Sequence, residues 1–93
     1  MAIDPCLVPL LPRFKQSCMD GIENIKVALA EGAFDTARRQ AHNLKGQGGM
    51  FGFATVTEAA ASLEKAALAE DQDGCQLKLE TLETVIAEAV AQI

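Results

Sequence analysis

His42 is the only histidine of the chain, and its setting is unusual for an acidic protein. If it lies on a helix, its neighbours one turn away are three cations and a glycine: Arg38, Arg39, Lys45 and Gly46. No acidic residue occurs between Asp35 and Glu58. Because its usual pKa is about 6.5, a neutral imidazole is a nucleophile at pH 7. These types and spacings indicate a histidine suited to handling a phosphoryl group.

Two plainer interpretations compete with this one. A lone histidine on a helix is usually an ordinary surface residue, and a run of cations is usually a solvated face. The glycines favour the chemical interpretation, because Gly46, Gly48 and Gly49 each cost a helix roughly 1 kcal/mol relative to alanine. A glycine four residues after His42 leaves room for another protein to approach. Phosphoryl transfer depends on positioning and nearby positive charge, which Lys45 can supply.

Apolar residues recur at helical spacing along the chain, and the alternating runs typical of strands are missing. The pattern predicts four helices, at about 8–31, 33–49, 55–69 and 73–93. Their apolar stripes should form the core: Leu11, Phe14, Cys18, Ile22, Ile25 and Leu29, then Phe34, Ala37, Ala41, Leu44 and Gly48, then Val56, Ala59, Ala60, Leu63 and Ala67, and last Cys75, Leu79, Leu82, Ile86, Ala89 and Ile93.

Local signals predict where the helices end. Gly32 is a good stop for the first helix. Thr55 and Glu58 have the spacing of a capping box, and Asp73 is placed to cap the last helix. Short connections make sequential helices antiparallel. We therefore predict an all-α fold, an antiparallel up-down-up-down four-helix bundle, as a single domain over residues 1–93.

Composition argues against several classes of function. A net charge of −5 argues against a nucleic-acid partner. No run of about 18 apolar residues is present, so no membrane span is expected. The N-terminus lacks the basic region of a signal peptide, which makes the cytoplasm the expected location. The separated cysteines Cys6, Cys18 and Cys75 fit neither a disulfide framework nor a zinc site, and no metal site is expected.

The segment Ala41-His42-Asn43-Leu44-Lys45-Gly46 resembles the A-H-x-L-K-G signature of histidine-containing phosphotransfer (HPt) domains. Residues 47–53 are similar to the glycine-rich run that follows in the phosphotransfer domain of chemotaxis histidine kinases. The resemblance covers about residues 8–70, and the last helix agrees only in pattern. It implies a four-helix phosphocarrier rather than an enzyme. The sequence contains no phosphate-binding glycine loop, so no ATP site is expected.

The resemblance also implies residue roles. His42 matches the phosphoacceptor, reacting through Nε2, and Lys45 matches the lysine near the phosphoryl group. Gly46 matches the small residue that gives access. Glu64 falls where family members carry a Gln or Glu that hydrogen-bonds Nδ1, although spacing alone favours a solvated face for it. We expect a receiver to dock on the rim of His42, on residues such as Arg38, Arg39, Gly49 and Met50.

The expected partners are response-regulator receiver domains, a histidine kinase, or both, in a bacterial two-component phosphorelay. No cofactor is expected, and Mg²⁺ should belong only to the receiver. Because Met1 looks like a natural start and no linker trails the chain, we expect a free-standing protein, and a monomer. Two alternatives stay open: a docking or inhibitory module that is not phosphorylated, and a detached domain of a larger histidine kinase.

Two positions depart from the family pattern. Gln47 replaces the small residue that usually follows the glycine, which can alter contacts at the docking face. Ala33 stands where an aspartate often caps the second helix, so that helix start lacks its usual support.

Overall fold

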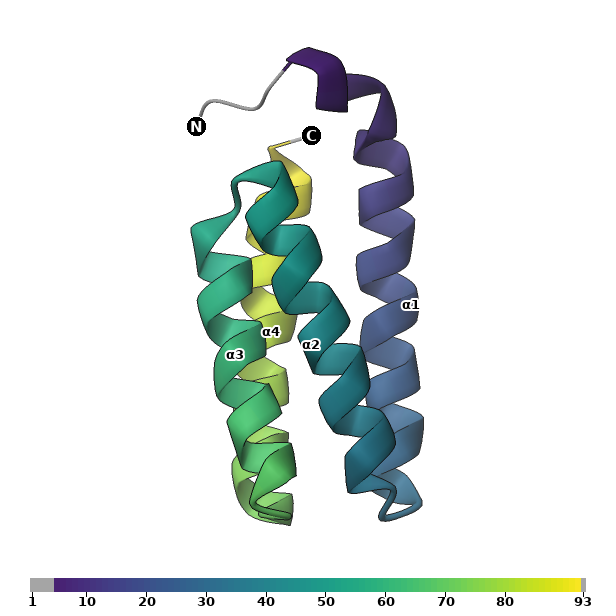
Figure 1. Cartoon of the computed structure of the whole chain (residues 1–93), viewed down its shortest axis with the longest axis vertical. Helices are drawn as coiled ribbons and strands as arrows, with labels where there is room; N and C mark the ends of the chain where they lie inside the picture. Colours follow the sequence, from purple (N-terminus) through teal and green to yellow (C-terminus); the bar gives the residue numbers. More distant parts are fainter. Residues whose placement is uncertain (1–4, 93) are drawn as a thin grey trace.

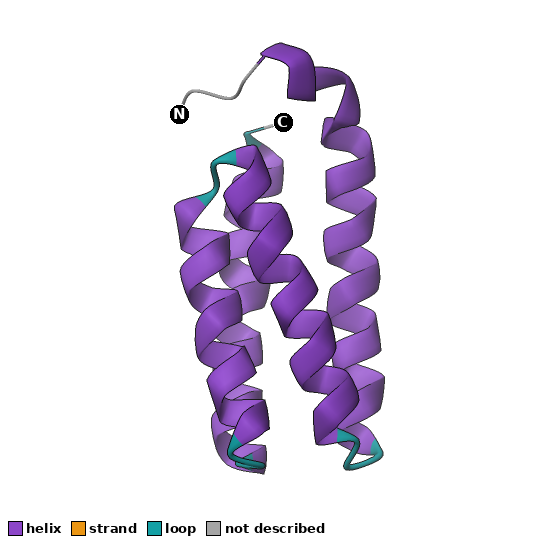
Figure 2. Ribbon diagram, viewed as in Figure 1, coloured by secondary structure: helices purple, strands orange, loops and turns teal. Residues whose placement is uncertain are grey.

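The computed structural model describes residues 5–92 as helices joined by short loops, with no strand in that range (Figure 2). A 3-10 helix, η1 (Pro5–Leu10), precedes four α-helices: α1 (Leu11–Ala30), α2 (Phe34–Phe51), α3 (Ala54–Leu68) and α4 (Gln72–Ala91). Each α-helix runs opposite to the one before it, in a bundle with extents of 39 × 18 × 18 Å (Figure 1). The predicted all-α four-helix bundle is confirmed.

The predicted apolar stripes form the core. The predicted residues from Leu11 to Ala89 are buried, except that Phe34 is only partly buried; Ile93 lies outside the described residues. Cys18 and Cys75 belong to this core, and burial raises the pKa of both thiols, that of Cys18 to about 11. Both cysteines therefore act as small apolar side chains.

Aromatic rings close one end of the core. The ring centroid of Phe14 lies 4.6 Å from that of Phe51 and 5.2 Å from that of Phe53. Because Phe14 belongs to α1 and the other two flank the end of α2, this contact holds the glycine-rich end of α2 against α1. It helps α2 to continue to Phe51, two residues beyond the predicted end at Gly49.

Three turns of one kind join the helices. In each, the chain passes through a left-handed residue with positive φ, which is 69° at Gly32, 77° at Gly52 and 55° at Glu70. The next residue's N–H then donates to a carbonyl of the last helical turn: Ala33 to Ala28 at 2.8 Å, Phe53 to Gly48 at 2.8 Å, and Asp71 to Ala66 at 3.0 Å. These tight turns reverse the chain, and Gly32 ends the first helix as predicted.

Two of the predicted helix caps are wrong. The N-cap of α3 is Phe53, whose side chain makes no capping bond, so Thr55 lies inside the helix and forms no capping box. The N-cap of α4 is Asp71 rather than Asp73, because the Asp71 carboxylate accepts a hydrogen bond from the Gly74 N–H at 3.0 Å. The start of α2 at Ala33 has no side-chain cap, as its sequence implies.

Candidate functional site

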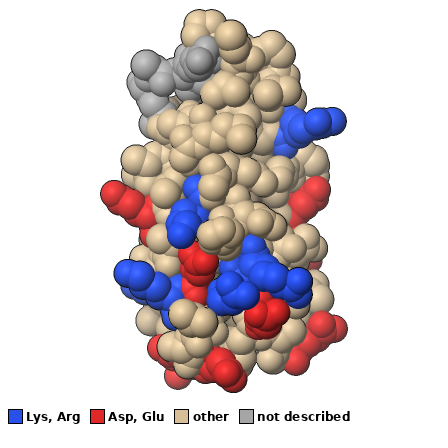
Figure 3. All heavy atoms as spheres, in the orientation of Figure 1, with Lys and Arg blue, Asp and Glu red and all other residues tan. Residues whose placement is uncertain are grey.

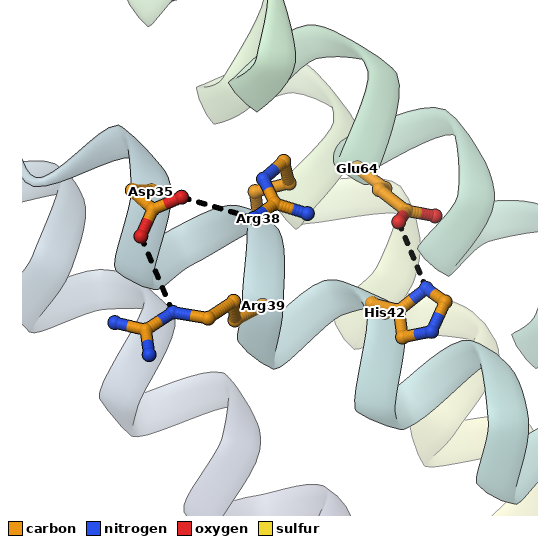
Figure 4. Close-up of polar contacts among 5 residues, drawn as sticks. All are labelled: Asp35, Arg38, Arg39, His42 and Glu64. Carbon is orange, nitrogen blue, oxygen red and sulfur yellow. Dashed lines mark hydrogen bonds and ion pairs between the residues drawn. The ribbon is translucent and has the colours of Figure 1, made fainter.

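His42 lies on the solvent side of α2, one residue after the buried Ala41. Its side chain is 61% exposed, and its Nδ1 lies 2.9 Å from Oε2 of Glu64 on α3 (Figure 4). The structure thus brings together two residues that are far apart in the sequence. One edge of the imidazole faces α3, and the edge that carries Nε2 points away from Glu64 (Figure 4).

The contact with Glu64 determines which ring nitrogen carries hydrogen. An ionised carboxylate can only accept hydrogen bonds, so Nδ1 must be the donor. In a neutral ring the lone pair is then on Nε2, which is free to attack an electrophile. The arrangement therefore presents Nε2 as the nucleophilic atom.

The Glu64 carboxylate is shared between two partners. While Oε2 accepts from His42, Oε1 lies 3.1 Å from Nζ of Lys45. Partial burial, with 20% of the side chain exposed, raises the pKa of Glu64, but hydrogen bonds and charges from Lys45 and His42 outweigh it. The pKa of Glu64 therefore lies below its ordinary value, and its carboxylate stays ionised near neutral pH.

Arg38 and Arg39 are paired with the acid that precedes them. Arg38 Nη2 lies 3.0 Å from Oδ1 of Asp35, and Arg39 Nε lies 3.3 Å from Oδ2 of the same carboxylate (Figure 4). The hydrogen bond from Arg38, aided by the charges of both arginines, holds the pKa of Asp35 below its ordinary value. The sequence analysis missed this pairing, although spacings of three and four residues on a helix could have indicated it.

Basic and acidic side chains alternate on the lower part of the face in Figure 3, whereas the upper part is mostly uncharged. The sequence around His42 is rich in cations, but in the folded protein carboxylates of Asp35 and Glu64 lie among them. A depression of about 300 Å³ lies beside the imidazole, lined by Thr36, Arg38, Arg39, Gln40, His42 and Asn43.

The glycines of α2 occupy different environments. A Cβ atom on Gly46 would meet no atom within 4 Å outside its own stretch of helix, so this position is open to solvent. Gly49 and Met50 are also exposed, Met50 to 61%. Gly48 is buried against Thr57 of α3, a residue that the sequence analysis did not single out.

The described part of the chain has neither a metal-binding cluster nor a helix that could span a membrane. Among residues 5–92, no group of three or more His, Cys, Asp or Glu side chains could hold a metal ion. None of the helices in that range is long and apolar enough to cross a membrane.

Comparison with known proteins gives one match. The family model of the Hpt domain matches residues 9–92, which include the last helix as well as the segment around His42. No curated protein and no solved structure matches the chain.

Proposed function

The chain belongs to the Hpt domain family, and on that premise we propose that His42 accepts a phosphoryl group from one signalling protein and donates it to another. Hpt domains are phosphocarriers that act with receiver domains and kinases in two-component phosphorelays. The observation that carries the proposal is the contact between Nδ1 of the exposed His42 and the Glu64 carboxylate at 2.9 Å. A docking module that is never phosphorylated has no need for an oriented imidazole.

The proposed transfer is a displacement at phosphorus. Nε2 of His42 forms a bond to phosphorus while the bond from phosphorus to the donor's oxygen breaks, and that oxygen leaves with the bonding electrons. The ring becomes positively charged, and the Glu64 carboxylate stabilises this charge through Nδ1–H. Donation to a receiver aspartate is the same displacement in reverse, with a carboxylate oxygen as nucleophile.

Lys45 also takes part in the proposed transfer. It lies one helical turn from His42, and its ammonium is paired with the Glu64 carboxylate. A phosphoryl group on Nε2 offers new acceptor oxygens, so Lys45 can move to them and stabilise the transferred group. Because the Lys45 side chain is 36% exposed, we expect a ground-state gain of only about 0.2–1 kcal/mol.

The partner supplies the remaining catalysis. We propose that a receiver domain brings the Mg²⁺ and that a kinase brings the ATP, so the carrier itself uses no cofactor. The docking surface would be the rim of the imidazole, on residues such as Arg38, Arg39, Gly49 and Met50. Gly46 would keep that approach open, since no atom outside its own stretch of helix lies within 4 Å of where its Cβ would be. We expect the exchange to take place in the cytoplasm, with the carrier acting as a monomer.

A labelling experiment tests the proposed function. The protein is incubated with an active histidine kinase or a phosphorylated receiver that carries a radiolabelled phosphoryl group. We expect a label that is lost in acid and stable in alkali, as for a P–N bond, and absent from His42→Gln. Circular dichroism checks that this variant keeps its helices. No label from any kinase or receiver of the source organism would contradict the proposal.

A further inference from the structure

Helices α2 and α3 approach each other closely at Gly48 and Thr57. A Cβ atom on Gly48 would lie 2.8 Å from Oγ1 of Thr57, closer than real side chains come, and 3.0 Å from the Thr57 backbone nitrogen, which is a very tight contact. The Thr57 hydroxyl lies 3.2 Å from the carbonyl oxygen of Lys45 and donates a hydrogen bond to it. The two helices can therefore approach closely because Gly48 on α2 has no side chain, and the Thr57 hydroxyl on α3 adds a hydrogen bond between them.

This contact lies beside the pair of His42 and Glu64. His42 precedes Gly48 by six residues and Glu64 follows Thr57 by seven, which at about 1.5 Å per residue are distances of about 9 and 10.5 Å along the helices. Because α2 and α3 run in opposite directions (Figure 1), a residue before Gly48 and a residue after Thr57 lie on the same side of the contact. A change in the axial position of this contact would therefore move the Glu64 carboxylate along the imidazole of His42.

The pair of His42 and Glu64 needs such a constraint. A hydrogen bond weakens quickly when its atoms move beyond about 3.2 Å. A slide of α3 by about 1.5 Å, the rise of one helical residue, would stretch a contact of 2.9 Å that runs across the helices to about 3.3 Å. The buried residues of α2 and α3 include several alanines: Ala37, Ala41, Ala59, Ala60 and Ala67. Small side chains form low ridges, which resist sliding less than large ones do.

We propose that Thr57 is a positioning residue, which together with Gly48 fixes the axial register of α3 on α2 and so places the Glu64 carboxylate on Nδ1 of His42. Thr57 acts through Glu64 and touches no reacting atom. The importance of this placement for transfer rests on the proposed function, whereas the placement itself is measurable without any partner protein.

The test removes the hydroxyl and measures the imidazole. Thr57→Val keeps nearly the same volume without a donor, Thr57→Ala is a second such variant, and Thr57→Ser keeps the donor. Thr84→Val is the matched control, since the Thr84 hydroxyl donates to the carbonyl of Glu80 at 3.1 Å on α4, away from the site. Nitrogen-15 NMR measures the fraction of neutral His42 with hydrogen on Nδ1. Phosphorus-31 NMR measures phosphorylation by phosphoramidate, a small donor.

We expect Thr57→Val and Thr57→Ala to lower the fraction of Nδ1–H and to slow phosphorylation by about twofold to tenfold, the range that corresponds to one hydrogen bond. For Thr57→Ser and Thr84→Val we expect the same fraction of Nδ1–H and the same phosphorylation rate as in the unchanged protein. In a Glu64→Ala background, which is itself slow, Thr57→Val should have no further effect, because no carboxylate remains to be placed.

Two results would overturn the inference. In one, the Thr57 variants keep the Nδ1–H fraction and the rate although Glu64→Ala changes both, which would mean that other contacts set the register. In the other, Thr57→Val slows phosphorylation equally with and without Glu64, which would mean that Thr57 does not act through it. A protein that shows the expected change on Nδ1 but takes no label from any kinase or receiver would support the inference and overturn the proposed function.

Discussion

Glu64 is the residue on which both halves of the site depend, since one oxygen holds His42 and the other holds Lys45. Its role could not be read from the residues themselves, because an acid on a helix face is usually solvated. Only the family resemblance pointed to Nδ1, and the bond to Lys45 was not foreseen. The contact of a carboxylate on one helix with side chains on another depends on the relative axial position of the two helices. The sequence of either helix alone does not determine that position.

The lowered pKa of Glu64 predicts a dependence of stability on acid. A carboxyl group with a lower pKa in the folded state than in the unfolded state stabilises the fold above the unfolded value, here near 4.5. This stabilisation is lost as the pH falls through the folded value. We expect the free energy of unfolding to fall between pH 5 and pH 3 by less in Glu64→Gln than in the unchanged protein, as urea titrations at each pH would measure.

The same titrations must allow for a second carboxylate. Asp35 also has a lowered pKa, caused first by its hydrogen bond from Arg38, so some loss in acid should persist in Glu64→Gln. An equal loss of stability in both proteins would show that the pairing of Glu64 with His42 and Lys45 does not stabilise the fold.

At the scale of the helices, replacing different glycines of α2 by alanine would place the new methyl group in different surroundings. A Cβ on Gly48 would collide with Thr57, whereas one on Gly49 would lie 3.9 Å from Thr57 Oγ1, an ordinary contact. We therefore expect Gly48→Ala to lower the free energy of unfolding by about 1–3 kcal/mol through overpacking. Gly49→Ala, the matched control, should raise it by up to about 1 kcal/mol through helix propensity.

Urea or thermal unfolding followed by circular dichroism measures both variants. If Gly48→Ala were as stable as Gly49→Ala, then α2 and α3 could separate without cost, and the close approach at Gly48 would not be a constraint. That result would also weaken the argument that this contact sets the register of the two helices.

The apolar spacing predicted the helices and their buried faces, because burial of a stripe follows directly from helical periodicity. The helix starts were harder to predict. Asp71 and Asp73 both precede a helical pattern. Only the left-handed turn at Glu70 decides between them, since this turn follows α3 and lies directly before Asp71. Glycine usually occupies such a position, so a glutamate there gave no signal. Thr55 was wrongly predicted as a cap because a capping residue must lie directly before the first helical turn, and α3 already begins at Ala54.

At the scale of the molecule, the proposed docking face predicts a dependence on salt. Arg39 is 65% exposed and borders the depression beside His42. If an acidic receiver docks there, Arg39→Ala should lower the apparent second-order rate of transfer severalfold at low salt and by less at high salt, because ions screen exposed charges over about 10 Å.

The matched control is Lys78→Ala, which removes an exposed cation from α4 rather than from α2. Rapid-quench measurements of transfer at two salt concentrations would compare the variants. Equal effects of the two substitutions would assign the salt dependence to overall charge rather than to the rim of His42.

The exposure of His42 has a consequence for the lifetime of the proposed phosphohistidine. The imidazole stands at an open helix surface, 61% exposed, so a group bound to it has no enclosing walls. If His42 carries a phosphoryl group as proposed, water can reach the P–N bond as freely as a partner can, and the lifetime of the phosphorylated form is then limited by the hydrolysis of that bond. Discrimination between partners would then depend on contacts at the proposed docking rim and on the acceptor, and not on a pocket around the imidazole.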